Sequence, residues 1–174
     1  MTAGRTPSRV RSAAAFFLVF FPAVYLVSLG SGALIEPDEA RYGEIPREMI
    51  ESGDFLTPRL NYVKYFEKPP LYYWLTGASL ALLGRNEYAV RLPTAVMALA
   101  GIALTGLLAR RFFGPRAGLL AAVVLGSAGG YLAMGQLAVI DMTLTFFLST
   151  GTALLMLAAL GEERGWDRGA ALFL

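Results

Sequence analysis

The segment AAAFFLVFFPAVYLVSLGSGALI, residues 13–35, carries no charged side chain. About 20 consecutive apolar residues cross the hydrocarbon core of a bilayer, so this run predicts a transmembrane helix. It exceeds the apolar core of a secretory signal peptide, which is about 7–15 residues long, and this length argues against cleavage. The composition agrees with a membrane protein, because only 16% of the 174 residues are charged, against about a quarter in soluble domains.

Three later runs are mostly apolar and close to a span in length, at 88–109, 117–137 and 142–161. A further run begins at Gly169 and stops at Leu174. A half-inserted helix would leave backbone groups unpaired in lipid, so we expect the chain to be a fragment of a longer protein. The runs together predict an all-α, polytopic membrane helix bundle with about four spanning helices.

Arginines lie unevenly around these runs: three precede the first and three lie in 110–116, and neither group contains an acid. Positive charge near the end of a span favours the cytoplasm, so residues 36–87 are predicted to face the periplasm of a bacterial inner membrane. The short apolar run Leu71–Leu83 is then expected to be a helix that lies in the outer interface or re-enters it. The predicted order is a cytoplasmic N-terminus (1–12), transmembrane helix 1 (13–35), a periplasmic loop with interfacial helices (36–87), transmembrane helix 2 (88–109), a cytoplasmic loop (110–116), transmembrane helix 3 (117–137), a periplasmic turn (138–141), transmembrane helix 4 (142–161), a cytoplasmic loop (162–168) and the start of a truncated helix 5 (169–174).

The first part of the predicted outer loop, PDEARYGEIPREMI at residues 37–50, is typical of a helix with proline in its first turn. Its inward face is expected to carry Asp38, Tyr42, Ile45 and Met49, and its water-exposed face Glu44, Arg47, Glu48 and Glu51. Asp38 is then a carboxylate on an otherwise apolar face. It is either a cap at the helix start or an active-site acid, and Glu39 fits the cap role equally well.

The second part, YFEKPPLYYW at residues 65–74, places two prolines just before the short apolar run, which hold Glu67 and Lys68 at its entrance. A lysine there can neutralise a phosphate or simply extend from the lipid surface into water. Asp141, a lone acid on the same predicted side, is either a functional acid or a marker of the interface. The chain has no cysteine or histidine, so any catalysis must rely on carboxylates, Lys, Arg or Tyr.

The two motifs together resemble the first outer loop of the lipid-linked sugar transferases, the membrane family (GT-C fold) that includes the protein O-mannosyltransferases. The similarity covers roughly residues 16–160, and within the family it is greatest to the bacterial transferases that attach 4-amino-4-deoxy-L-arabinose to lipid A. It is carried by Asp38-Glu39 with Arg41-Tyr42, by Tyr65-Phe66-Glu67-Lys68-Pro69-Pro70, and by the GD-x-x-x-P-R-L-N stretch between them.

This resemblance implies a membrane glycosyltransferase that moves a sugar from a polyprenyl-phosphate donor to a periplasmic acceptor, such as lipid A or another glycan or protein. It implies that Asp38, with Glu39 beside it, supplies the catalytic acid, and that Lys68 contacts the donor phosphate. The further residues expected at the substrate site are Glu67, Arg41, Tyr42, Arg59 and Asp141, with Arg85 as a second helper at the phosphate. No cofactor and no nucleic-acid partner are expected, while Asp38 and Glu67 offer oxygen ligands to a divalent cation.

Two other interpretations stay open from the sequence. The chain would be a transporter or flippase subunit if its outer acids guided ions or lipid headgroups. It would be a catalytically inactive, truncated membrane protein if it lacked a complete cavity. The small number of charges at mid-depth in the four runs argues against the transporter.

Overall fold

A computed structural model describes the backbone of residues 8–170 and the side chains of residues 8–160. The elements are helical except for one two-stranded antiparallel hairpin, which confirms the all-α prediction. They are α1 (Ser8–Leu26), α2 (Asp38–Ser52), β1 (Arg59–Leu60), β2 (Val63–Lys64), α3 (Leu71–Leu83), α4 (Glu87–Phe113), α5 (Pro115–Ser127), α6 (Gly129–Gln136) and α7 (Ile140–Ala170).

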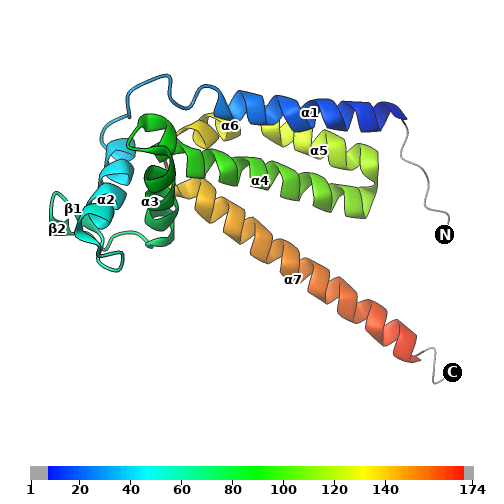
Figure 1. Ribbon diagram of the computed structural model, residues 1–174. Coiled ribbons are helices and arrows are strands. Elements are labelled where there is room, and N and C mark those ends of the chain that lie inside the picture. The colour runs from blue at the N-terminus through cyan, green and yellow to red at the C-terminus, as the bar shows by residue number, and fades with distance from the viewer. Residues whose placement is uncertain (1–7, 171–174) are drawn as a thin grey trace.

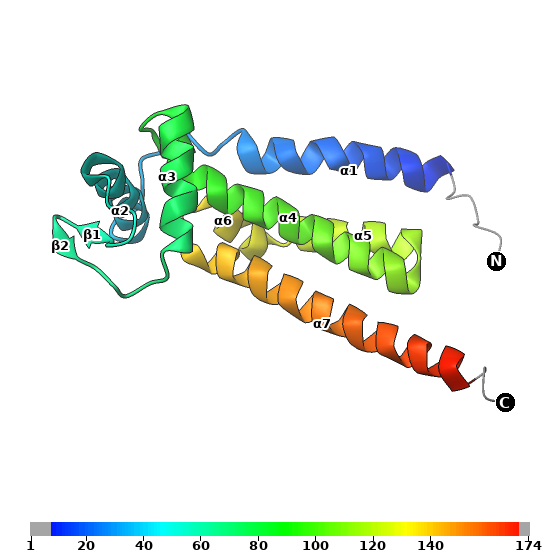
Figure 2. The ribbon, with the colours of Figure 1, turned by 60° about the horizontal axis from the view of Figure 1, so that its bottom comes forward.

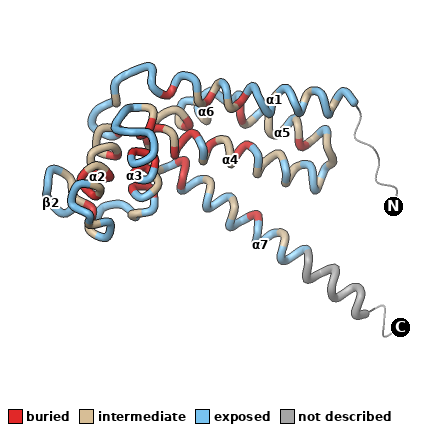
Figure 3. Tube along the Cα trace, viewed as in Figure 1, coloured by how far each residue is buried: buried red, intermediate tan, exposed pale blue. Residues whose placement is uncertain are grey.

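The long helices α1, α4, α5 and α7 extend from one end of the molecule, where α2, α3 and the hairpin gather (Figure 1). Helix α4 is central and contacts α1, α3, α5, α6 and α7. Helix α3 lies across the ends of the long helices rather than along them (Figure 2). Burial concentrates where α2 and α3 meet the first turns of α4 and α7, whereas most residues of α7 between 144 and 160 are exposed (Figure 3).

Within the described residues, three helices are long and apolar enough to cross a membrane: α1, α4 and α7. Helices α5 and α6 form a fourth candidate as a pair bent by 63°. The chain is therefore a multi-pass membrane protein. The bend lies at Ala128, whose extended backbone (φ −65°, ψ 118°) interrupts the helix that the sequence predicted without a break at 117–137.

Two further predicted boundaries differ from the structure. The first helix ends at Leu26 rather than at residue 35, because the carbonyl groups beyond it are bound by a side chain of α4, as described below. The predicted loop at 162–168 is helical, since α7 continues to Ala170. Glutamate and arginine favour helix, so charge alone does not end one. Of the predicted terminal segments, residues 1–7 and 171–174 lie outside the described residues.

Helix α2 packs one face against α3. Tyr42, Ile45 and Met49 of that face are buried against Tyr72 and Tyr73, as the pattern predicted. The helix ends at Gly53, whose positive φ of 70° suits glycine and whose N–H donates to the Met49 carbonyl at 3.0 Å.

The prediction that Glu48 faces water is wrong. This side chain is 2% exposed, and both of its carboxylate oxygens accept from the backbone N–H of Tyr62, at 3.0 and 3.2 Å. A long-range contact to the hairpin has thus covered a position that helical periodicity alone assigns to solvent.

Helix α1 packs closely on α6 because glycine leaves room for its aromatic side chains. A Cβ atom on Gly135 would lie 2.6 Å from Tyr25 Cε1 and 2.9 Å from Ala98 Cβ, so the glycine is enclosed by α1 and α4. The Tyr25 hydroxyl donates to the Gly126 carbonyl at 3.1 Å, and Gln136 Nε2 donates to the Val24 carbonyl at 3.0 Å. These contacts fix the C-terminal end of α1 on the bundle.

We expect Gly135→Ala to destabilise the protein by about 1–3 kcal/mol, because overpacking forces buried neighbours apart. Thermal unfolding in detergent measures the change. Gly130→Ala is the matched control in the same helix, since a Cβ there meets nothing within 4 Å. The control should be neutral or slightly stabilising, because alanine favours helix over glycine. Equal unfolding temperatures for the two variants would contradict this account of α1 packing.

Candidate functional site

Two buried charges of opposite sign meet at the α2–α3 end: Glu39, which is 2% exposed, and Arg91, which is 6% exposed. They form a two-point ion pair: Arg91 Nε donates to Glu39 Oε1 at 2.9 Å, and Nη2 donates to Oε2 at 2.8 Å. Such forked pairing of a guanidinium with a carboxylate is geometrically specific and strong.

Each partner also binds backbone groups of other segments. Arg91 donates to the carbonyls of Leu29, Gly32 and Ala33 at 2.7–2.9 Å. Glu39 accepts from the N–H of Ile35 at 2.8 Å and from the N–H of Ala138 at 2.7 Å. We call this set of contacts the Glu39–Arg91 junction; it joins the end of α1, the start of α2, α4 and the α6–α7 connection.

The junction keeps Glu39 ionised. Burial alone would raise the pKa of this carboxyl, but the hydrogen bonds from Arg91, Ala138 and Ile35 lower it below its ordinary value of 4.5. No side chain caps the start of α2, so the predicted cap is not formed by either Asp38 or Glu39. The sequence analysis missed Arg91 as a functional residue; an arginine inside an apolar run was the available signal.

Asp38, in contrast, is exposed in the first turn of α2. One turn on, the Tyr42 ring meets the Tyr72 ring edge to face, with centroids 5.4 Å apart. Burial raises the pKa of Tyr42, and the negative charges of Asp141 and Asp38 raise it further. Both carboxylates, one from α2 and one from α7, therefore lie near enough to Tyr42 to affect its hydroxyl.

A hydrogen-bonded chain runs beside these acids. Arg41 Nη1 donates to the Tyr65 hydroxyl at 3.1 Å, and that hydroxyl donates to Glu67 Oε2 at 2.8 Å. The hydrogen bond to Tyr65 raises the pKa of Arg41, and the charges of Asp38 and Glu67 add to it. Tyr65 was part of the quoted motif but was not predicted as a site residue.

The structure thus gathers five of the predicted site residues with one that was missed. We call this the acid–tyrosine cluster; its members are Asp38, Arg41, Tyr42, Tyr65, Glu67 and Asp141. Lys68 follows Glu67 directly, is exposed, and forms no ion pair with any described side chain. A cationic side chain without an internal partner is available to an anionic ligand.

Arg59 and Arg85, the two other cations expected at a phosphate, are held elsewhere. Arg59 pairs with Asp54 at 3.4 Å, next to the hairpin. Arg85 pairs with Glu51 at 2.9 Å. The structure does not bring either of them into the acid–tyrosine cluster.

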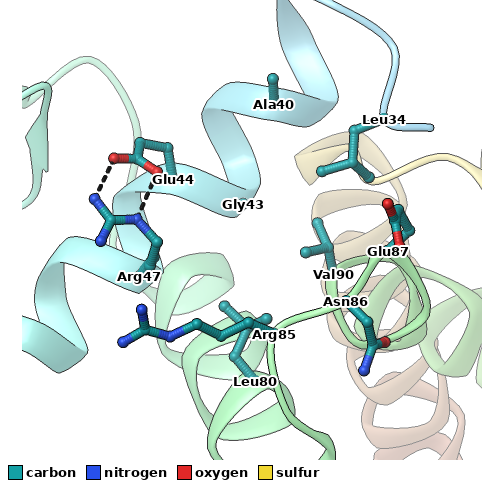
Figure 4. A pocket seen from close by; sticks show the side chains of 10 residues that line it. All are labelled: Leu34, Ala40, Gly43, Glu44, Arg47, Leu80, Arg85, Asn86, Glu87 and Val90. Carbon is teal, nitrogen blue, oxygen red and sulfur yellow. Dashed lines mark hydrogen bonds and ion pairs between the residues drawn. The ribbon is translucent and has the colours of Figure 1, made fainter.

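A cavity of about 310 Å³ lies between α2, α3 and the start of α4 (Figure 4). Its charged lining includes Arg47, whose Nε donates to Glu44 at 2.7 Å, and Arg85. The Arg47 hydrogen bonds lower the pKa of Glu44. Both arginines are therefore already neutralised by carboxylates, which makes this cavity a poorer site for a phosphate than the surface beside Lys68.

Among the residues that the structure describes, no three acidic side chains are grouped closely enough to hold a metal ion. Asp38 and Glu67, the two predicted oxygen ligands, both lie close enough to Arg41 to raise its pKa. A guanidinium at that point competes with a cation for the same carboxylates.

Comparisons with known proteins agree with this architecture. A family model described as dolichyl-phosphate-mannose-protein mannosyltransferase matches residues 67–174. An undecaprenyl phosphate-alpha-4-amino-4-deoxy-L-arabinose arabinosyl transferase of Edwardsiella ictaluri is 35% identical over 154 residues, covering 88% of this chain and 27% of that protein. The corresponding protein of Yersinia enterocolitica is 35% identical over 167 residues, covering 94% and 30%.

Solved structures give the same result. The chain superposes on ArnT from Cupriavidus metallidurans bound to undecaprenyl phosphate with a TM-score of 0.78 and 39% identity, covering 82% of this chain and 26% of that one. For the apo state the TM-score is 0.72 at 40% identity. The predicted fold class and the resemblance to lipid-linked sugar transferases are confirmed. The chain spans 26–30% of the length of these relatives.

We expect Glu39→Gln to destabilise the protein by about 3–5 kcal/mol, as breaking one side of a buried ion pair does. Each oxygen of Glu39 accepts from Arg91 and from one backbone N–H. In either orientation, the NH₂ group of the glutamine would therefore face two hydrogen-bond donors. The matched control is Glu51→Gln, which removes an exposed partner of Arg85 and should cost less than about 1 kcal/mol. Chemical unfolding in detergent measures both.

The difference between wild type and Glu39→Gln should also depend on pH. The folded state lowers the pKa of Glu39, so the stabilisation is complete above pH 4.5, its ordinary pKa, and is lost as the pH falls through the lower folded value. Unfolding curves from pH 7 to pH 3 should therefore converge at the acid end. A gap that stays constant over this range would refute an ionised Glu39.

Proposed function

Because the chain belongs to the dolichyl-phosphate-mannose-protein mannosyltransferase family, we propose that it takes part in moving a sugar from a polyprenyl-phosphate donor to an acceptor outside the inner membrane. The observation that carries the proposal is the acid–tyrosine cluster, in which an exposed Asp38 acts on Arg41 and the hydrogen-bonded chain from Arg41 through Tyr65 ends at Glu67, the residue before Lys68. These are the residue types that glycosyl transfer from a phosphate needs.

The donor in this proposal is undecaprenyl phosphate carrying 4-amino-4-deoxy-L-arabinose, and the acceptor is lipid A. The names of the curated relatives support the donor, as does the relative whose structure is described as bound to undecaprenyl phosphate. The acceptor follows from the resemblance of the outer loop. Arginines at 110–116 and before α1 favour the cytoplasm for that end of the bundle, which places the acid–tyrosine cluster in the periplasm.

The proposed reaction is a displacement at the anomeric carbon. An acceptor oxygen forms the new bond, the bond from that carbon to the phosphate oxygen breaks, and the lipid phosphate leaves with the electron pair. Asp38 takes the acceptor proton as an ionised carboxylate. The Lys68 ammonium offsets the charge that develops on the leaving phosphate.

Other residues position these two groups. The Glu39–Arg91 junction fixes the first turn of α2 and so the backbone of Asp38. We therefore assign Glu39 to positioning, since both of its oxygens already accept hydrogen bonds. Arg41 and Tyr65 hold Glu67 at the entrance of α3, directly before Lys68.

We expect Asp38→Asn in the full-length protein to retain expression and lower transfer by about 10²–10⁴-fold, the usual contribution of a positioned acid–base group. Mass spectrometry of lipid A after incubation with the lipid-linked sugar measures the product. The control is Asp54→Asn, an acid of the same loop that pairs with Arg59 instead and should change the rate less than about threefold. Undiminished product from Asp38→Asn would remove the assignment.

We also propose that the transfer requires no divalent cation, because Arg41 already provides positive charge beside Asp38 and Glu67. Activity should persist after dialysis against a chelator, within about twofold of the untreated rate, and added Mg²⁺ or Zn²⁺ should not raise it. Loss of activity on chelation with recovery on adding a metal would overturn this part of the proposal. Hard cations with oxygen ligands would then be needed at these two carboxylates.

A further inference from the structure

A groove of about 570 Å³ runs between α1, α4 and α5, at the end of the bundle opposite α2 and α3. Its walls are apolar side chains such as Phe17 and Leu107, and its floor includes two glycines, Gly106 and Gly118. The C-terminal end of α1 is held against α5 through Tyr25, while the groove is lined by α1 residues from Val10 to Pro22. Its apolar lining suits a hydrocarbon chain.

Two arginines from different helices line one end of this groove: Arg11 of α1 and Arg110 of α4. Both are exposed, and no carboxylate among the described side chains pairs with either. Two like charges that face one groove repel each other unless an anion lies between them. The end of the groove therefore suits a single negatively charged group.

We propose that this arginine groove binds an anionic glycerophospholipid. Its phosphate lies between Arg11 and Arg110, and one acyl chain lies along the apolar walls. Basic pockets between transmembrane helices are a recurrent way of binding anionic headgroups. The occupant is a lipid rather than a soluble anion because the groove continues from the arginines into apolar surface that would otherwise lose its contacts.

This lipid is distinct from the sugar donor. Lys68 and most of the acid–tyrosine cluster belong to α2 and the segment before α3, whereas Arg11 and Arg110 belong to the start of α1 and the end of α4, at the opposite end of the bundle. In the proposed orientation the arginines belong to the cytoplasmic leaflet. A lipid in the groove would connect α1 to α4 and α5 where the groove separates their side chains. This role does not depend on the transfer reaction.

Native mass spectrometry of the full-length protein tests the proposal, with phosphatidylglycerol and phosphatidylethanolamine of identical acyl chains as probes. We expect one tightly held phosphatidylglycerol, bound about thirty-fold more strongly than phosphatidylethanolamine, from two arginines near the headgroup. Arg11→Ala with Arg110→Ala should abolish this preference. The matched control is Arg9→Ala with Arg111→Ala, which removes two charges from the same end but from outside the groove and should keep the preference.

The hydrocarbon part is tested by Ala103→Phe, which fills the groove wall and should weaken phosphatidylglycerol binding at least tenfold while the arginines remain. Equal retention of both lipids, or equal loss in the two double-arginine variants, would overturn the proposal. So would full retention in Ala103→Phe, because the lipid would then be held only at the surface.

A helix of a longer chain is the competing occupant. The chain has no cysteine, so a single Ala103→Cys variant can be labelled with a lipid-soluble maleimide in the full-length protein. Rapid labelling in lipid-depleted detergent that slows when phosphatidylglycerol is added supports the proposal. Complete protection whether or not lipid is present would mean that protein fills the groove, and it would refute lipid binding.

Discussion

The architecture of the α2–α3 end depends on one buried ion pair. Glu39 and Arg91 are 52 positions apart in the chain, and between them they satisfy carbonyl and N–H groups of two connections, α1–α2 and α6–α7. Burying either charge alone would be costly, since an isolated ion loses its hydration. Together they allow the polypeptide to leave the helical state between α1 and α2 without orphaned backbone groups, close to where the long helices end.

That junction explains how the acid–tyrosine cluster is assembled from distant parts of the chain. The carboxylate of Glu39 accepts a hydrogen bond from the N–H of Ala138, just before α7, and Glu39 directly follows Asp38 in α2. The first turns of α2 and α7 are thus fixed by the same side chain, and Asp38 and Asp141 project from them. Lys68 reaches the same region through Pro69 and Pro70, which restrict the backbone before α3. Catalytic groups on helix ends supported by a buried network are held more precisely than groups on free loops.

The sequence predicted the features that depend on neighbouring residues. Leu71–Leu83 forms the short helix with those bounds, and the inward face of α2 carries Tyr42, Ile45 and Met49, because hydrophobic length and period are local properties. The features that it missed are long-range. Glu48 is buried by the hairpin, and α1 ends early because Arg91, far along the chain, binds the carbonyls that follow it. No periodicity within a window of one helix contains that information.

The Glu39–Arg91 junction limits which residues of the protein can change in evolution. Leu29, Gly32, Ala33, Ile35 and Ala138 contribute only main-chain atoms to it. Gly32, Ala33 and Ile35 are exposed, so their side chains can change in evolution while the geometry persists, whereas packing restricts the buried Leu29 and Ala138. The two charged residues have the least freedom, since changing one leaves the other unpaired inside the protein. Relatives that lose the glutamate should lose the arginine as well, so the pair should appear as correlated substitutions.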